Sequence, residues 1–177
     1  DTYDFYLTYH GGNGIDGSGM DMISTVRYCE PGYSCPWANA FWDGSQTAFG
    51  DGYAVDDVVG HEWTHGVTAH ESGLIYYAQS GAINESFSDI WGEFIDLVNG
   101  KGNDAASVRW LCGEDSSTGA IRDLSDPPAY SDPDRIGSAY YFCGSSDNGG
   151  VHTNSGVGNK AAYLMTDGGT FNGYTVT

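Results

Sequence analysis

Basic residues and long hydrophobic runs are scarce in this chain of 177 residues. Six Lys and Arg stand against 24 Asp and Glu, so the formal net charge is -18. Binding to phosphate needs a basic surface, so neither nucleic acid nor an anionic membrane is expected as a partner. The apolar runs are only a few residues long, which predicts no transmembrane segment. The acidic excess either serves solubility or supplies carboxylates for hard cations such as calcium.

Cysteine is also rare, and none of the four cysteines forms a Cys-x-x-Cys pair. A zinc site ligated by sulfur is therefore not expected. An even number of separated cysteines suits two disulfides and a secreted, extracellular protein. We expect the pairs Cys29–Cys35 and Cys112–Cys143, because each pair lies within one irregular segment. Four free buried thiols are the alternative.

The residue pattern predicts an α+β fold in one unit, 1–177, since no linker marks a domain boundary. Residues 1–55 are rich in Gly, Tyr, Asp and Asn and are expected to form a mainly β lobe of short strands and turns. Helices and loops are expected over 56–177. Within these two parts we expect strands in 24–30 and 38–52, helices over 56–71, 82–99 and 154–165, and mostly loop over 100–150.

The first predicted helix contains the sequence His-Glu-Trp-Thr-His, from His61 to His65. Two histidines four residues apart lie on one helix face, so both imidazoles can bind the same ion. Glu62 projects roughly 100° away around the helix, beside such an ion, where it can take a proton from water. Two surface histidines on an acidic helix are the alternative.

The second predicted helix supplies two more carboxylates at helical spacing, Glu85 and Asp89. Glu85 can complete a His₂Glu ligand set for catalytic zinc, and Asp89 can accept the second ring N–H of a ligand histidine. A solvated acidic face is the alternative. We expect the opposite, apolar face of this helix to pack on the first helix through Val58, Val59 and Val67. That face comprises Ile83, Phe87, Ile90, Trp91, Phe94, Ile95 and Val98.

Asn84-Glu85-Ser86 also fits a glycosylation sequon. A glycan there would block the predicted zinc site, so we interpret the sequon as accidental.

Several motifs together resemble the thermolysin-like zinc metalloprotease family of the gluzincin type. They read HEWTH at 61–65, GLIYYAQSGAINESFSD at 73–89 and DNGGVHTNSG at 147–156. The likeness extends from TYDFY at 2–6 to GVGNKAAYLM at 156–165. It implies a thermolysin-like metalloprotease core, with the zinc-binding helix and a packed second helix forming the floor of a cleft.

The resemblance implies a role for each matching residue. His61, His65 and Glu85 match the zinc ligands, Glu62 the general base and Asp89 the partner of the first histidine. Tyr76 and His152 match the groups that hydrogen-bond the oxyanion, and Asp147 orients His152. Arg122, Asn39 and Ala40 match positions that bind the substrate backbone, and Val58 and Ile121 match positions in the pocket after the scissile bond.

The family also carries a double calcium site, and Asp57, Asp96 and Glu114 fall on three of its ligand positions. Arg109 and Leu111 stand where acidic ligands are expected. An arginine repels a nearby cation, so we expect one calcium, with Asn103 or Asp104 as further ligands. Solvated acids are the alternative.

The chain begins with Asp1 and matches the central part of the family's catalytic domain. We expect it to be a processed product, a fragment or a trimmed form, with the C-terminal helical lobe truncated and with its own propeptide or the missing remainder as partners.

We therefore expect a secreted zinc endopeptidase that acts on peptide or protein substrates and prefers a bulky hydrophobic residue after the scissile bond. The alternatives are an inactive, calcium-stabilised binding or inhibitory module that keeps the zinc site, and a zinc hydrolase of non-peptide substrates.

Overall fold

The computed structural model describes residues 1–177 and confirms an α+β fold. In chain order the elements are α1 (Thr2–His10), β1 (Ser24–Val26), β2 (Ala40–Trp42), β3 (Thr47–Phe49), α2 (Asp56–Glu71), α3 (Ala78–Asn99), β4 (Leu111–Cys112), β5 (Arg122–Asp123), the 3₁₀ helix η1 (Pro127–Tyr130), α4 (Asp147–Asn154), α5 (Gly156–Asp167), β6 (Gly169–Phe171) and β7 (Tyr174–Val176). No helix combines the length and the apolar character that crossing a membrane needs.

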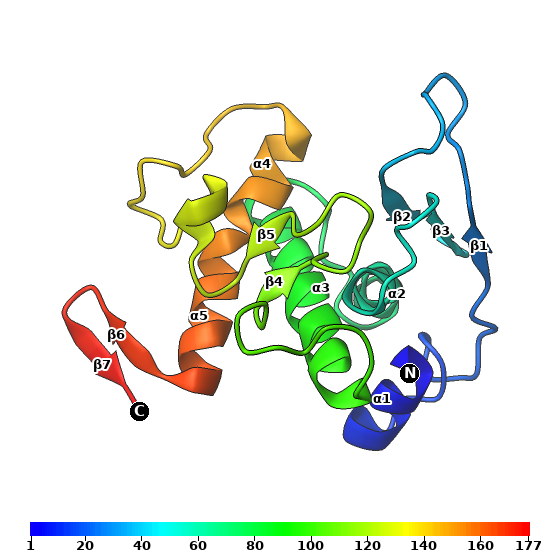
Figure 1. Cartoon of the computed structure of the whole chain (residues 1–177), viewed down its shortest axis with the longest axis horizontal. Coiled ribbons are helices and arrows are strands. Elements are labelled where there is room, and N and C mark those ends of the chain that lie inside the picture. Colours follow the sequence, from blue (N-terminus) through cyan, green and yellow to red (C-terminus); the bar gives the residue numbers. More distant parts are fainter.

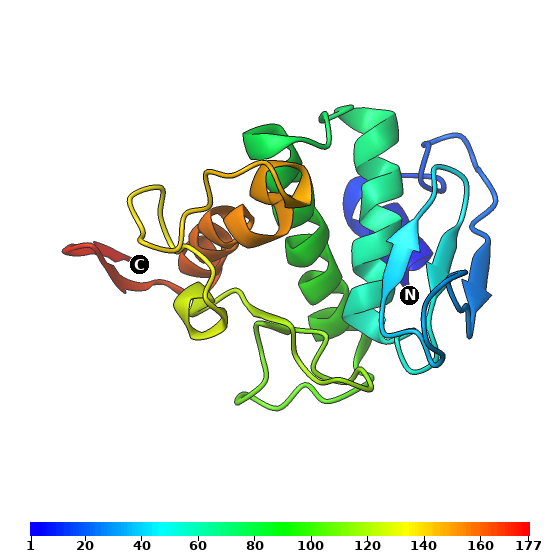
Figure 2. The same ribbon diagram turned by 90° about the horizontal axis from the view of Figure 1, so that it is seen from above.

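The two central helices, α2 and α3, lie side by side in both views of the molecule (Figures 1 and 2). A three-stranded sheet covers the outer side of α2, and α4 and α5 cover the opposite side of α3. This order of layers places the helix with the two histidines between the sheet and the helix with Glu85.

The sheet has the order β1-β3-β2, with β1 parallel and β2 antiparallel to β3. β2 pairs from Ala40 opposite Phe49 to Trp42 opposite Thr47. Because β2 pairs on one side only, its other edge can accept a further extended chain. β2 also contacts α2, so this edge lies beside the helix with the two histidines.

Small apolar clusters hold these layers together. Phe49, Tyr53 and Val58 join the sheet region to α2, and Phe5, Tyr6 and Ile95 join α1 to α3. A third cluster of Trp110, Cys112 and Leu124 fixes β4 and the chain after β5 beneath α3. Burial of these side chains provides the main favourable free energy for the assembly of the layers.

The helix predictions are confirmed in position and corrected in extent. The second helix begins at Ala78 rather than at residue 82, and the third runs over Gly156–Asp167. A separate helix, α4, precedes it and begins inside the predicted loop. The prediction of strands and turns throughout 1–55 is wrong for Thr2–His10, which forms α1. Its aromatic residues favour strands intrinsically, but Phe5 and Tyr6 pack against α3 in the helical conformation.

The prediction that the apolar face of α3 packs on α2 holds at Ile95, whose cluster Val67 contacts, and is wrong for most of that face. Buried residues of α3 include Glu85, Ser88, Asp89 and Gly92, and they face the centre of the molecule. Of the apolar face only Ile95 is buried, while three of its residues are exposed by 41–54 %, namely Ile83, Phe87 and Val98. Part of this face and part of α5 border an open apolar groove of about 420 Å³.

Glycine permits the close contact between the polar face of α3 and α2. A Cβ atom added to Gly60 would lie 2.9 Å from Cα of Gly92, and one added to Gly92 would lie 2.5 Å from the carbonyl oxygen of Asp57. The two backbones therefore approach too closely for larger residues at these positions.

One of the two predicted disulfides is confirmed and the other is wrong. Cys29 and Cys35 form a disulfide, with Cα atoms 5.8 Å apart. The predicted bond between Cys112 and Cys143 is wrong, because both thiols are free, Cys112 buried and Cys143 exposed. Cys112 lies on β4 and faces α3, whereas Cys143 lies in the exposed segment before α4.

Candidate active site

Three predicted ligand side chains converge at the contact between α2 and α3. His61 Nε2 is 3.0 Å from His65 Nε2 and 3.4 Å from Glu85 Oε2, and His65 Nε2 is 3.4 Å from Glu85 Oε1. Ligand atoms bound tetrahedrally to zinc at roughly 2.0–2.1 Å are about 3.3 Å apart. The spacing of these donor atoms therefore fits one zinc ion.

Burial and charge at this centre also fit a cation. Glu85 is fully buried, and its Oε2 has no hydrogen-bond partner. Burial alone would lower the pKa of His61, but the carboxylates of Asp89 and Glu85 outweigh it and raise that pKa to about 10. Burial and the neighbouring His61 lower the pKa of His65 to about 4, which leaves its imidazole neutral and able to ligate. The anionic centre thus favours positive charge between these side chains.

Both histidines are oriented through their other ring nitrogen. His61 Nδ1 lies 2.8 Å from Asp89 Oδ1, as the sequence predicted for this pair. His65 Nδ1 lies 2.7 Å from Asn84 Oδ1 and 3.1 Å from Ser88 Oγ. The sequence pattern did not predict this role of Asn84, although the residue lies one position before Glu85. Asn84 is buried, which agrees with the interpretation of its sequon as accidental.

Asp89 is itself held by several donors. Arg122 donates from Nε to Oδ2 at 2.8 Å and from Nη2 to Oδ1 at 2.6 Å. Asn159 on α5 donates to Oδ2 at 2.8 Å. Burial would raise the pKa of Asp89, but Arg122 and His61 outweigh it and hold the pKa well below its usual range. The side chains of Arg122 and Asn159 therefore keep Asp89 ionised and fixed toward His61.

A cavity of about 660 Å³ opens above the three ligand residues. All predicted catalytic and substrate-binding residues except Asp147 line it: Glu62, Tyr76, His152, Asn39, Ala40, Arg122, Val58 and Ile121. Glu62 is buried beside the ligands, and burial raises its pKa to about 7. A carboxyl group with such a pKa can accept and return a proton near neutral pH.

Tyr76 and His152 meet on one side of the ligand cluster. The Tyr76 hydroxyl donates to Glu85 and lies 3.2 Å from His152 Nε2. Asp147, outside the cavity lining, accepts from the backbone N–H of His152 at 3.0 Å and lies 2.6 Å from its Nδ1. The chain from Asp147 to Gly150 has positive φ at every residue, and this turn brings the Asp147 carboxylate back to His152.

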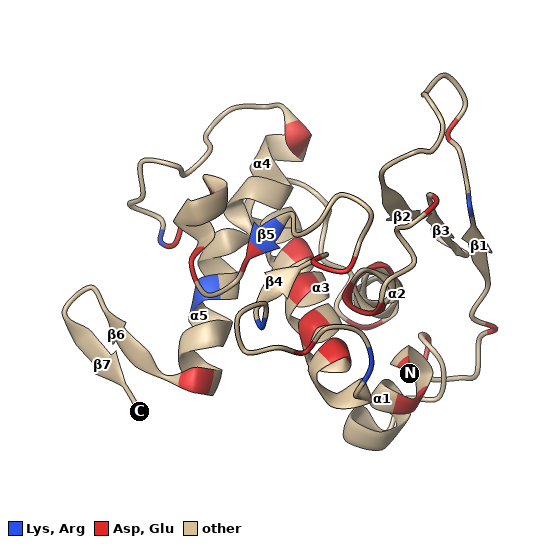
Figure 3. Cartoon of the chain, in the orientation of Figure 1, with Lys and Arg blue, Asp and Glu red and all other residues tan.

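Two predicted calcium ligands, Asp57 and Asp96, lie on α2 and α3, and the third, Glu114, follows β4; none of the three lines the cavity. Asp57 is buried, and its carboxylate accepts the backbone N–H of Val58 at 2.7 Å and that of Gly113. Burial and mutual repulsion raise the pKa of Asp96 to about 7 and that of Glu114 to about 8. Figure 3 shows acidic residues in a row along α3.

One further acid of this cluster, Glu93, was not predicted from the sequence. It is buried and accepts the backbone N–H of Trp110 at 2.6 Å, and its pKa is raised to about 8 by burial and neighbouring acids. Arg109, expected to repel a second cation, instead donates to Asp167 at 3.0 Å.

Two histidines and a glutamate that could hold one metal ion, with a second glutamate at the cleft, form an arrangement typical of metal-dependent hydrolases. Comparison with known proteins agrees with this class. Residues 1–69 match the family model of the thermolysin metallopeptidase catalytic domain, and residues 72–177 match that of the thermolysin metallopeptidase alpha-helical domain. The chain belongs to the thermolysin metallopeptidase family.

Individual proteins similar to this chain are also metalloproteinases by name or belong with them. The chain is 52 % identical over 172 residues to a zinc metalloproteinase of Renibacterium salmoninarum, covering 92 % of this chain and 31 % of that protein. It is 47 % identical over 188 residues to a bacillolysin of Brevibacillus brevis, covering 99 % and 32 %. The solved precursor of protealysin, a metalloproteinase from Serratia proteamaculans, superposes with a TM-score of 0.76 at 36 % identity, covering 93 % of this chain and 55 % of that one. The chain thus spans about a third of the length of the zinc metalloproteinase and of the bacillolysin.

Proposed function

We propose that this chain forms the active site of a zinc endopeptidase. The observation that carries the proposal is the set of donor atoms from His61, His65 and Glu85, 3.0–3.4 Å apart on the floor of the cleft. The orphaned oxygen of Glu85 and the adjacent Glu62 support it further. Family membership and the names of the relatives favour peptides as substrates.

A zinc ion bound by these three residues would polarise the scissile carbonyl and acidify a water molecule. Glu62 takes the proton from the attacking water and later returns it to the leaving amine. Its pKa of about 7, raised by burial, suits both transfers. Tyr76 and His152 donate hydrogen bonds to the carbonyl oxygen as negative charge develops there. Asp147 holds the His152 ring for this task through Nδ1.

The cleft offers a path for an extended substrate. Asn39 and Ala40 lie at the start of β2, whose free edge borders the cavity and can pair with a peptide backbone. Arg122 also lines the cavity, and we assign it a carbonyl contact in addition to its bonds to Asp89. Val58 and Ile121 line the cavity below, so we propose a bulky apolar residue after the scissile bond.

We further propose a structural calcium ion at the acidic cluster. Asp57, Asp96 and Glu114 are the ligands carried over from the sequence, and we add Glu93 because it is buried among them. Oxygen ligands with raised pKa values match the preference of calcium for several carboxylates. Asp104 belongs to the same charged group, since it contributes to the raised pKa of Asp96.

Secretion is part of the proposal, supported by the Cys29–Cys35 disulfide, which persists in oxidising compartments. The family of the chain and the protealysin precursor also favour a propeptide as an interaction partner.

Replacement of Glu62 by Gln tests the proposal most directly. The variant should bind one zinc per chain as the unaltered chain does, and peptide cleavage should fall by about 10²–10⁴-fold, the usual contribution of a general base. Metal content is measured by elemental analysis and cleavage with a quenched fluorescent peptide. A chain that binds zinc and shows no cleavage in either form would favour the binding-module alternative, and a chain that binds no zinc would overturn the site.

A further inference from the structure

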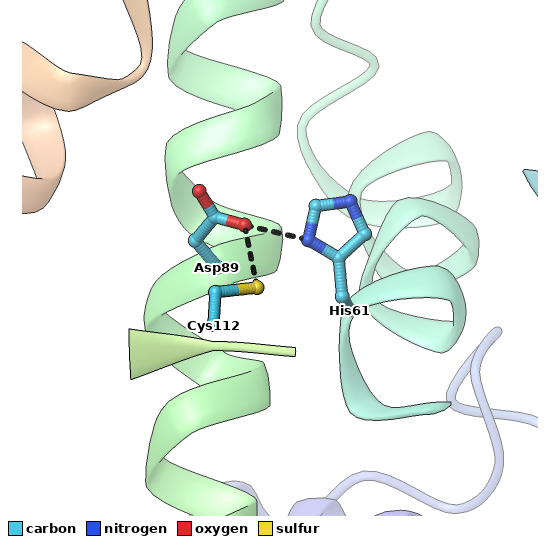
Figure 4. Close-up of side chains that lie close together, drawn as sticks. All are labelled: His61, Asp89 and Cys112. Atoms are coloured by element: carbon cyan, nitrogen blue, oxygen red, sulfur yellow. Dashed lines mark hydrogen bonds and ion pairs between the residues drawn. The ribbon is translucent and has the colours of Figure 1, made fainter. Parts of the chain in front are cut away.

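The thiol of Cys112 points toward the same carboxylate oxygen of Asp89 that His61 contacts (Figure 4). Its Sγ atom is 3.6 Å from Asp89 Oδ1, the same oxygen that lies 2.8 Å from His61 Nδ1. The thiol is buried and free, and it also lines the cleft. Cys112 therefore contacts Asp89, which in turn contacts the predicted zinc ligand His61.

His61, Asp89 and Cys112 have the composition of a second metal site, but their surroundings oppose one. Arg122 Nη2 is 2.6 Å from Asp89 Oδ1 and 3.7 Å from Cys112 Sγ. This guanidinium already neutralises the carboxylate and would repel a second cation at close range. The three side chains form a hydrogen-bonded group instead.

Within this group the thiol can act as a donor. An ionised carboxylate only accepts hydrogen bonds, so the proton between Sγ and Oδ1 belongs to the sulfur. Burial, aided by the charge of Asp89, raises the pKa of Cys112 well above its usual value, which agrees with a protonated thiol. The sulfur at the same time accepts from Arg122 Nη2. Cys112 thus bridges Arg122 and the oxygen of Asp89 that holds His61.

We propose that Cys112 is a positioning residue of the zinc centre, whose S–H bond to Asp89 Oδ1 keeps that oxygen aligned with His61 Nδ1. This inference rests on the proposed zinc function. Groups that orient a ligand histidine govern metal affinity as well as activity, because they set the tautomer and the direction of the ring. The thiol acts only through Asp89 and His61.

Two substitutions separate this role from packing. Cys112→Ser keeps a donor but loses volume and adds polarity, whereas Cys112→Val fills the apolar neighbourhood of Trp110 and Leu124 but has no donor. Both are made in a Cys143→Ser background, because the exposed Cys143 would otherwise form disulfides between molecules. The Cys143→Ser protein is the matched control.

The measurements are the zinc dissociation constant by competition with a chromophoric chelator, the melting temperature of the metal-free protein, and kcat and KM. We expect Cys112→Ser to retain the zinc affinity of the control within about threefold. Cys112→Val should bind zinc about 10-fold more weakly, at the lower end of the usual 10–100-fold effect because a thiol is a weak donor. Its kcat should fall while KM changes little.

The opposite ranking would overturn the inference. If Cys112→Val binds zinc as well as the control and Cys112→Ser is the weaker protein, the thiol serves packing alone. If Cys112→Val does not fold, Cys112→Ala replaces it as the variant without a donor, and zinc affinity equal to that of Cys112→Ser contradicts the proposal. A control protein that binds no zinc shows instead that the proposed function itself has failed.

Discussion

Gly60 of α2 and Gly92 of α3 meet at the crossing of the two helices that carry the proposed zinc ligands. A Cβ atom on Gly92 would lie 2.5 Å from the carbonyl oxygen of Asp57 and 3.2 Å from the backbone nitrogen of His61. Backbone atoms cannot rotate away as a side chain can, so any added carbon must separate the helices. The distance between His61 and Glu85 depends on this contact, since each helix carries part of the ligand set.

Gly92→Ala should therefore weaken folding and zinc binding together. Overpacking at a helix contact costs roughly 1–3 kcal/mol, which exceeds the helix propensity gained from Ala and corresponds to a loss of several degrees in melting temperature. Calorimetry and chelator competition measure the two effects. Gly137→Ala is the matched control, because nothing lies within 4 Å of a Cβ atom there. Unchanged zinc affinity in Gly92→Ala would show that the ligand geometry tolerates a wider spacing.

The sequence predicted that the proposed ligand side chains lie together, because the spacing within a helix determines which residues share a face. His61 and His65, and likewise Glu85 and Asp89, are four residues apart, and each pair points to the same place. The hydrophobic pattern also predicted the helix α3. It did not predict that the face with Gly92 and the buried polar residues meets α2. A metal centre buries polar groups at the expense of apolar ones, so the usual rule of an apolar face turned to the neighbouring helix fails there.

Other features depend on contacts between distant segments and could not be predicted. Nothing in the local sequence places Cys112 beneath Asp89 rather than beside Cys143, because the position of β4 depends on its packing with Trp110 and Leu124. In the same way, Asn159 reaches Asp89 across 70 residues of sequence. The helix α1 forms where aromatic residues favour strands, and its packing on Ile95 determines the outcome.

Tyr76→Phe should reduce kcat with little change in KM. The hydroxyl lies among Glu85 and His152, where it can donate to a carbonyl oxygen that becomes negative during the reaction. Loss of one such donor costs about 10²–10³-fold in kcat. Tyr77→Phe is the control, since Tyr77 is adjacent, exposed and absent from the cavity lining. A rise in KM alone would instead assign Tyr76 to substrate binding.

Asn84→Ala should weaken zinc binding by about 10-fold, since the ring of His65 loses the oxygen that lies 2.7 Å from its Nδ1. Competition with a chromophoric chelator measures this change.

Asn84 should also carry no glycan when the chain is produced in a eukaryotic secretory host, because the residue is buried. Intact-mass spectrometry of such material checks this expectation. A glycan at Asn84 would contradict the interpretation of the sequon as accidental.

The acidic cluster predicts a stability that depends on pH and calcium together. Folding raises the pKa of Glu93 and Glu114 to about 8 and that of Asp96 to about 7, mainly through burial. The folded protein without calcium then binds more protons than the unfolded chain between the ordinary carboxyl values and about pH 8. The contribution of these three acids to its stability is highest below that window and falls as the pH rises through it. Calcium should remove most of this fall, since it replaces the protons as the balancing charge.

Melting temperatures from pH 5 to pH 8 test this relation in protein stripped on a chelating resin, resupplied with zinc, and measured with and without calcium. Glu93→Gln should flatten the calcium-free profile, because the uncharged side chain can still accept the N–H of Trp110. It should also weaken calcium binding, since one carboxylate is lost. Glu71→Gln is the control, because Glu71 is exposed at the end of α2. A calcium-free profile that Glu93→Gln leaves as steep as Glu71→Gln does would show that these acids are not buried together in the folded protein, and the calcium site would have to be abandoned.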